Sequence, residues 1–296
     1  MCLLAVEFGS VGDTLNEIAL GVIRSISKGN YLLHSAILYF GFIFLEWIAY
    51  VKLRKSYNYK EAGTNILNQL IVEIGNAVIV GTGFFVIYIY VYNNMRLITL
   101  STSVAGFLIT FLLNDFVHYV DHRMQHRIGL LWAIHTAHHS SQEMNVLIAN
   151  RGTLLQLGML TAPAYLILPL CGANPQIFLV VFFLGNAWGI LSHTEIIKRL
   201  GLLENVLITP SNHRVHHGNQ KHYLDKNYGQ VLLIWDKLFG TYQRETEPPI
   251  YGLVDQLEKQ TVWNIQTAGL QRLLKNLRAT KGLSAKLRVL IAPPGS

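Results

Sequence analysis

Five long apolar segments constrain the fold more than any other feature of the sequence. Each is about as long as the roughly 20 residues that a membrane-spanning helix needs. Only 14% of the residues are charged, against about 25% in soluble domains. We therefore expect an all-α, integral membrane helical bundle with four or five transmembrane helices. The apolar segments are residues 31–51, 66–92, 97–116, 154–170 and 175–191.

The apolar pattern divides the chain into four parts. Residues 1–30 form an N-terminal amphipathic segment, and residues 31–116 form an N-terminal transmembrane region. Residues 117–245 are rich in histidine and include a second transmembrane hairpin. Residues 246–296 form a basic cytoplasmic or interfacial tail, in which apolar and basic residues alternate at helical spacing. That pattern fits a helix lying at the membrane interface as well as a solvated helix packed on the domain.

The distribution of basic residues predicts the membrane topology. The formal net charge is +7, and 14 of the 24 Lys and Arg residues follow His193. By the positive-inside rule, the basic segments share the cytoplasmic side, and only short connections such as 93–96 and 172–174 lie outside. The excess charge is thus a topology signal and gives no reason to expect a nucleic-acid partner. The two cysteines, Cys2 and Cys171, are too few for a disulfide framework or a thiolate metal site.

Histidines are the chemically informative residues of this chain. Of twelve histidines, eight fall in three tight groups. Residues three or four apart on a helix share a face, so each group directs its imidazoles to one place. One such pair is often incidental, but three groups exceed the four ligands of a structural zinc site and suit two metal ions. The groups are His122 and His126, then His135, His138 and His139, then His213, His216 and His217, with His193 as a candidate ninth ligand.

Ligand type alone does not choose the metal, because imidazole serves zinc, copper, iron and nickel. The membrane setting favours a substrate dissolved in the bilayer. Unactivated C–H bonds of a lipid require redox chemistry with oxygen, whereas zinc needs a carbonyl or phosphoryl group to polarise. The residues therefore favour a di-iron oxygenase, and a zinc-dependent membrane hydrolase or a metal transporter is the more distant alternative.

Three motifs carry a resemblance to a known family. Together they resemble the fatty acid hydroxylase and sterol desaturase superfamily, and the third is most similar to its alkylglycerol monooxygenase branch. The similarity covers residues 115–252, about half of the chain. The motifs are Asp115-Phe-x-x-Tyr119-x-x-His122-Arg123-x-x-His126, then Leu131-Trp132-x-x-His135-x-x-His138-His139-Ser140-Ser141, and then Thr209-Pro-Ser-Asn-His213-Arg-Val-His-His-Gly218 with Asp225-Lys-Asn-Tyr228 and Trp235-Asp-Lys-Leu-Phe-Gly-Thr-Tyr242.

The resemblance implies a membrane-bound di-iron monooxygenase that hydroxylates a lipid alkyl chain with O2. It implies two Fe ions held by the eight grouped histidines, with His193 as the extra ligand. For the alkylglycerol branch it implies tetrahydrobiopterin or another external reductant. A desaturase of the same superfamily remains an alternative, because one metal cage serves both reactions. The lipid, the electron donor and the oligomeric state do not follow from the sequence.

Several further residues lie near the predicted site. Metal-bound imidazoles usually donate their second nitrogen to a carboxylate or carbonyl, and Asp115 and Asp236 are the preferred partners because both belong to matched motifs. His222 is either a further ligand or partner of the site or a surface histidine. His118 is expected to form part of the wall. Residues 144–151 depart from the family pattern and are expected to border the substrate.

Overall fold

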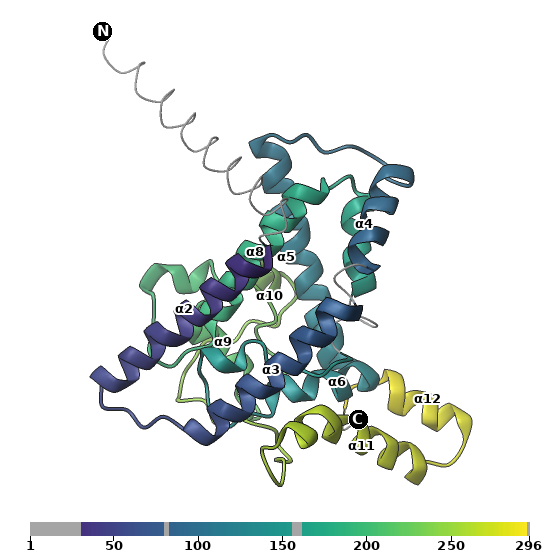
Figure 1. Cartoon of the computed structure of the whole chain (residues 1–296). Coiled ribbons are helices and arrows are strands. Elements are labelled where there is room, and N and C mark those ends of the chain that lie inside the picture. The colour runs from purple at the N-terminus through teal and green to yellow at the C-terminus, as the bar shows by residue number, and fades with distance from the viewer. Residues whose placement is uncertain (1–30, 80–82, 156–161, 295–296) are drawn as a thin grey trace.

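The computed structural model describes residues 31–79, 83–155 and 162–294. Within these ranges the regular elements are all helices, and the described residues contain two isolated β-bridges and no strand. The amphipathic segment expected at residues 1–30 lies outside them. The longer helices are α2 (Tyr31–Lys52), α3 (Tyr59–Ile79), α4 (Gly83–Asn94), α5 (Val104–Arg127), α6 (Gly129–His139), α8 (Pro175–Ser192), α11 (Val262–Ala279) and α12 (Leu283–Ile291), and the shorter ones are α7 (Ile167–Leu170), α9 (Pro210–His216) and α10 (Ile234–Leu238) (Figure 1).

Helices α5 and α8 pack side by side at the centre of the molecule (Figure 1). Asn174 caps α8, accepting a hydrogen bond from the Gln176 amide at 2.9 Å, and Pro175 occupies the first helical turn, where no donor is lost. Helix α8 therefore matches the predicted segment. Helix α5 starts later than predicted, behind its N-cap Ser103, and continues to Arg127. It thus carries the first histidine group directly on its last turns.

The connections before α5 and before α8 pair with each other at one end of the bundle. The Leu97 amide donates to the Leu170 carbonyl at 2.8 Å, and the Leu100 amide donates to the Gly172 carbonyl at 3.1 Å. Gly172 has a φ of +78°, and a Cβ there would lie 2.2 Å from the Ile98 carbonyl oxygen, so only glycine fits. Both connections that were predicted to share one side of the membrane therefore lie together. The histidine-bearing ends of α5 and α8 lie at the opposite end.

The segment at residues 154–170 differs from the single spanning helix that was predicted. Its described residues contain a 3₁₀ turn over Ala162–Leu166 followed by the four-residue helix α7. Pro163 and Pro169 lack amide donors, which explains why a long regular helix does not run through this stretch. Residues 66–92 likewise divide between α3 and α4.

Apolar side chains cover the outer faces of α2 to α5. Soluble monomers rarely expose contiguous apolar patches larger than a few hundred Å², and here the exposed surface is apolar along four helices. Among the described residues, α5 and α8 are long and apolar enough to cross a membrane. These features support a membrane protein, and the four or five crossings that were predicted stay a prediction. The exposed apolar residues include Ile37, Phe44, Leu45, Ile74, Val86, Tyr90, Leu108 and Leu112.

Helix α11 packs on α6, which is the helix of the second histidine group. Ile265 and Leu273 are the buried residues of α11. Gly269 lets the two backbones meet, because a Cβ at this position would lie 2.0 Å from the Ala133 carbonyl oxygen. Helix α11 thus packs on the domain, and its contact with a membrane interface stays a prediction.

The Gly269 contact predicts that glycine-to-alanine substitutions at two positions change the stability of the protein in opposite directions. Gly269→Ala should destabilise the protein by about 1–3 kcal/mol, because the new methyl group overpacks a backbone contact. Gly63→Ala, in α3, meets nothing within 4 Å and should stabilise by up to about 1 kcal/mol through helix propensity. Thermal unfolding of the detergent-solubilised protein measures both. Equal midpoints for the two variants would contradict the packing of α11 on α6.

Candidate metal centre

Four elements bring nine histidines together. Helix α5 contributes His122 and His126 from its last turns, and α6 contributes the second group from its C-terminal half. Helix α9 and its C-cap contribute the third group. His193 is the C-cap of α8 and joins them. All nine side chains are buried.

The nine side chains form two adjacent sets, whose ring nitrogens lie within 4.8 Å of one another in each set. The sets touch, since the rings of His139 and His217 are stacked 4.5 Å apart. We call them the five-histidine set and the four-histidine set. The five-histidine set is His122, His126, His135, His139 and His216, and the four-histidine set is His138, His193, His213 and His217.

The spacing of the ring nitrogens is that of ligands around a common ion. Five pairs of Nε2 atoms within the sets lie 2.9 to 3.2 Å apart. Nitrogens bound to one ion at about 2.1 Å lie about 3.0–3.4 Å from each other in octahedral or tetrahedral geometry. The side chains are therefore positioned to hold two ions.

Backbone carbonyls fix the tautomers of four rings. A carbonyl oxygen only accepts hydrogen bonds, so the Nδ1 atom facing it carries the proton and leaves a lone pair on Nε2. The four contacts are His122 Nδ1 to the Tyr228 oxygen at 2.9 Å, His138 Nδ1 to the Arg151 oxygen at 3.3 Å, His193 Nδ1 to the Gly189 oxygen at 2.6 Å and His216 Nδ1 to the Lys226 oxygen at 2.8 Å.

His138 and His193 give the sharpest test of metal binding. Both use Nδ1 to donate to the backbone, and their Nε2 atoms face each other at 3.2 Å. Two lone pairs at this distance repel unless a proton or a metal cation lies between them. Burial opposes the proton, because it lowers the pKa of His193 to about 4 and holds the pKa of His138 well below its usual range. A metal cation therefore satisfies this pair best.

The same electrostatics applies to the other histidines of α6 and α9. Burial lowers the pKa of each well below the ordinary value, so the imidazoles are neutral at pH 7 and their lone pairs are available. His216 Nε2 is buried and has no hydrogen-bond partner among the described residues. Buried polar atoms are normally paired, so this orphaned lone pair also fits a metal ligand.

Asp115 and Asp236 were predicted to orient histidines directly, but in the structure Asp115 of α5 and Asp236 of α10 both bind the loop 228–235. Asp236 accepts from the Tyr228 and Gly229 amides at 2.8 and 2.9 Å. Asp115 accepts from the Val231 and Leu232 amides and from the Trp235 indole. The Tyr228 carbonyl in turn accepts from His122. Neither carboxylate is within hydrogen-bond distance of a described histidine, so both act through the loop.

His222 and His118 lie outside both sets. His222 is exposed and forms an ion pair with Glu247 at 3.5 Å. Its position is that of a surface histidine. His118 Nδ1 lies 3.3 Å from the Tyr165 hydroxyl, and its ring is 5.5 Å from that of His122. This agrees with the wall position expected for it.

Arg151 links the second histidine group to two distant parts of the chain. Its side chain is fully buried. The guanidinium donates to the Ala137 carbonyl at 3.0 Å and to Asn65 at 2.6 Å, and it pairs with Glu61 at 3.4 Å. It also donates to Ser140 and Gln260. The residues 144–151 thus pack against the site through a charged network, which sequence reasoning did not identify because Glu61 and Asn65 lie about 90 residues away.

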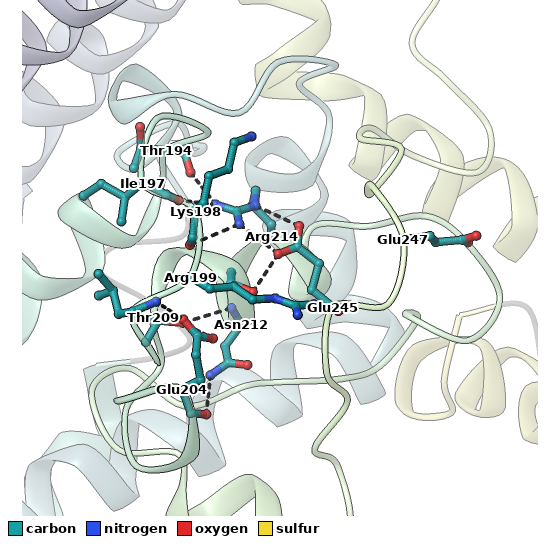
Figure 2. A network of polar contacts seen from close by, with 12 residues as sticks. Thr194, Ile197, Lys198, Arg199, Glu204, Thr209, Asn212, Arg214, Glu245 and Glu247 are labelled. Atoms are coloured by element: carbon teal, nitrogen blue, oxygen red, sulfur yellow. Dashed lines mark hydrogen bonds and ion pairs between the residues drawn. The ribbon is translucent and has the colours of Figure 1, made fainter. Parts of the chain in front are cut away.

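Arg214 links the third histidine group to the segment after His193 (Figure 2). Its guanidinium donates to the Thr194 carbonyl at 3.0 Å and to the Ile197 carbonyl at 2.7 Å. On the other side it forms a two-pronged ion pair with Glu245, at 3.0 and 2.8 Å. Burial would raise the pKa of Glu245, but hydrogen bonds from Arg214 and Ser211 outweigh it and lower the pKa. One buried cation therefore fixes two ligand segments of the four-histidine set relative to each other.

Glu46 has a similar linking position. It lies in the apolar helix α2. Its carboxylate accepts from the Thr194 hydroxyl at 2.5 Å and from the Val146 amide at 2.8 Å. It therefore joins α2 to the two loops that border the four-histidine set.

Comparison with known proteins agrees with this arrangement. Residues 107–241 match the fatty acid hydroxylase family, and this range contains all nine histidines. This part of the chain is therefore similar to the fatty acid hydroxylases. The helices that begin and end this region, α5 and α10, are tied together by Asp115 and the loop 228–235. The two ends of the matched region are thus held together beside the two sets.

Three relatives extend the comparison. The chain is 37% identical over 212 residues to alkylglycerol monooxygenase of Homo sapiens, which covers 70% of this chain and 46% of that protein. It is 33% identical over 138 residues to an ornithine lipid hydroxylase of Rhizobium tropici, covering 45% of this chain and 40% of the relative. A Delta(7)-sterol 5(6)-desaturase of Eremothecium gossypii is 26% identical over 169 residues, covering 56% of this chain and 45% of the relative. The chain thus spans about half the length of these relatives. No solved structure matches it.

The two sets predict separable losses of metal. His135→Ala should lower the metal content of the five-histidine set, and His213→Ala that of the four-histidine set, because each substitution leaves an open coordination position. Metal per folded chain, measured by mass spectrometry of the elements, should fall in both variants. His222→Ala is the control and should bind as much metal as the parent protein. Full metal content in His135→Ala and His213→Ala would exclude the two histidine sets as metal sites.

The Arg214 network predicts a graded effect of two substitutions on the same site. Arg214→Lys keeps the positive charge but loses the planar guanidinium that binds Glu245 through two nitrogens. Arg214→Met loses both the charge and the guanidinium. Breaking this buried pair should cost about 3–5 kcal/mol and reduce metal in the four-histidine set, with Met worse than Lys. Thermal unfolding and metal content measure the two effects. The nearby exposed Arg244→Met should change neither, and an Arg214→Met protein with the parent's stability would refute the role of this network.

Proposed function

We propose that this chain is a membrane-bound, O2-dependent non-haem di-iron monooxygenase that hydroxylates the alkyl chain of a lipid. The observation that carries the proposal is the pair of adjacent all-histidine sets, including two facing ring nitrogens that a bound cation would satisfy. We assign the nine histidines as the metal ligands. Asp115, Asp236, Arg151 and Arg214 position them.

Iron is the metal that fits both the ligands and the setting. Structural zinc sites are closed by four ligands, whereas the first set offers five imidazoles beside a second set of four. A hydrolytic zinc site would also need a polar substrate group to polarise. Bound iron would supply the one-electron and oxygen chemistry that an unactivated C–H bond needs. A zinc hydrolase or a metal transporter is therefore disfavoured.

The protein's own contribution is to orient the histidine rings and to keep water out of the site. Carbonyls of Tyr228, Arg151, Gly189 and Lys226 hold four rings in one tautomer with Nε2 directed inward. The rings are buried beneath helices whose outer faces are apolar. A lipid chain would therefore approach from the bilayer, and water would be excluded around the reacting carbon.

We place the two sets on the cytoplasmic side of the membrane. The basic connection between α2 and α3 lies at the histidine end, where Lys55 pairs with Glu195 at 3.9 Å. The opposite end, formed by the connections 95–103 and 171–174, carries Arg96 as its single basic residue. The positive-inside rule then puts the histidine end in the cytoplasm.

The substrate class follows from the relatives. Alkylglycerol monooxygenase and ornithine lipid hydroxylase are both named for oxygen insertion into lipids. An alkylglycerol-type ether lipid is the substrate that we propose, with tetrahydrobiopterin or another external reductant. The sterol desaturase shares less sequence identity with this chain, so hydroxylation is favoured over desaturation.

Isotope labelling distinguishes hydroxylation from desaturation. Membranes that contain the protein are supplied with an alkylglycerol, a reduced pterin and ¹⁸O2, and the lipids are analysed by mass spectrometry. We expect a product that has gained one ¹⁸O atom, and ring removal in His135→Ala should lower turnover at least about 100-fold, since an incomplete metal site loses its redox chemistry.

Two outcomes would overturn the proposal. Loss of two hydrogens without oxygen incorporation would identify a desaturase. Unchanged lipids with an iron-loaded protein, across ether lipids and acyl lipids, would exclude a lipid hydroxylase. The surface variant His222→Ala serves as the matched control and should turn over like the parent.

A further inference from the structure

The whole net charge of the protein resides in its last 38 residues. Residues 259–296 contain seven of the 24 Lys and Arg residues and none of the 17 Asp and Glu residues. The preceding 258 residues hold 17 basic and 17 acidic residues and are neutral by this count. This segregation is independent of the histidine sets. It indicates an anionic partner for the segment that contains α11 and α12.

Helix α12 presents an apolar stripe to the outside. Leu283, Leu287 and Ile291 are four residues apart and therefore share one face. Their exposed fractions are 76%, 49% and 66%. No residue of α12 is buried, so this face has no partner in the part of the chain that the structure describes.

The opposite face of α12 is the one that contacts the domain. The Val289 carbonyl lies so close to Gly129 that a Cβ there would approach it to 2.2 Å, and the Gly129 amide donates to the Ala292 carbonyl at 3.0 Å. The face of α12 opposite the apolar stripe therefore packs against the start of α6. Lys286 and Arg288, both exposed, flank the apolar stripe. An apolar stripe with basic residues on both sides is the pattern of a helix that lies in a bilayer surface.

The start of α11 continues the apolar surface of the bundle. Val262 and Trp263 form one wall of a shallow apolar groove of about 450 Å³, and Ile71 of α3 lines the other wall with Leu154 and Leu155. Trp263 is 70% exposed, and tryptophan is enriched where a protein meets the lipid headgroups. In Figure 1, α11 and α12 form a hairpin beside α6, at the end of the molecule away from α4. This hairpin thus adjoins the lipid-facing side of α3.

We propose that the α11–α12 hairpin is a docking surface for an anionic lipid bilayer. The stripe of α12 inserts among the acyl chains near the headgroups, and the seven basic residues lie against acidic phospholipids. Because α12 is fixed to the first residue of α6 and α11 to its middle, the docked hairpin holds the ligand-bearing helix at a set depth. The proposal goes beyond the oxygenase reaction and does not depend on it.

Depth-dependent fluorescence quenching tests the docking directly. The full chain, with Cys2 and Cys171 replaced by serine, carries an environment-sensitive dye on Leu287→Cys and is placed in nanodiscs with brominated lipids. We expect quenching in discs with about 30% phosphatidylserine in phosphatidylcholine, and weak quenching in pure phosphatidylcholine. High salt should reduce the difference between the two kinds of disc, since exposed charges are screened.

Charge variants supply the matched comparison. Lys281→Gln, Lys286→Gln and Arg288→Gln together should lower the partition of the labelled helix onto the anionic discs about tenfold or more. Lys198→Gln, Lys221→Gln and Arg244→Gln remove the same charge from exposed positions outside the hairpin and should leave the quenching unchanged. Metal content, measured in parallel, confirms that each variant is folded and requires no turnover.

Three results would overturn the proposal. The dye on residue 287 could stay unquenched in anionic discs, which would mean that the stripe is solvated. It could be quenched equally in neutral discs and in the charge variant, which would exclude recognition of acidic lipids. Its signal could instead depend on the number of protein copies per disc, which would identify a second copy as the occupant. None of these results bears on whether the metal centre hydroxylates lipids.

Discussion

The structure depends on the electrostatic problem of packing nine neutral imidazoles into one buried volume. Lone pairs of His138 and His193 face each other across 3.2 Å, and their remaining nitrogens are already committed to the backbone. Protonation is opposed by burial, so a cation is what makes this arrangement stable. The rest of the chain can be understood as the framework that brings these lone pairs together and keeps them dry.

That framework is built from buried charges that bridge separate parts of the sequence. Arg151 joins α3 to α6, Arg214 joins α9 to the segment after α8, and Asp115 and Asp236 hold the loop whose carbonyl orients His122. Each of these side chains fixes the backbone of neighbouring segments through hydrogen bonds. Such contacts would keep the histidines in position before a metal binds. Truncating one partner would leave a buried charge, so these groups are costly to change.

The sequence predicted the histidines well because ligand spacing is a local property of helices. All eight grouped histidines and His193 converge as expected, and α8 has nearly the predicted ends. The acids were harder to predict. Asp115 and Asp236 belong to recognisable motifs, yet they bind loop amides, because a carboxylate is satisfied by whichever donors the fold brings near it. Arg151 and Arg214 act over long sequence separations, which no local pattern reveals.

The division of ligands between the two sets has a consequence for how the protein is made. Four of the five residues in the first set lie within His122 to His139, a stretch that emerges from the ribosome together. The second set draws on His138, His193 and His213, so its members lie on both sides of α8 in the chain. Because His216 of the first set and His213 of the second both lie on α9, neither set can be complete until this last histidine group has been synthesised and has folded back onto α5 and α6.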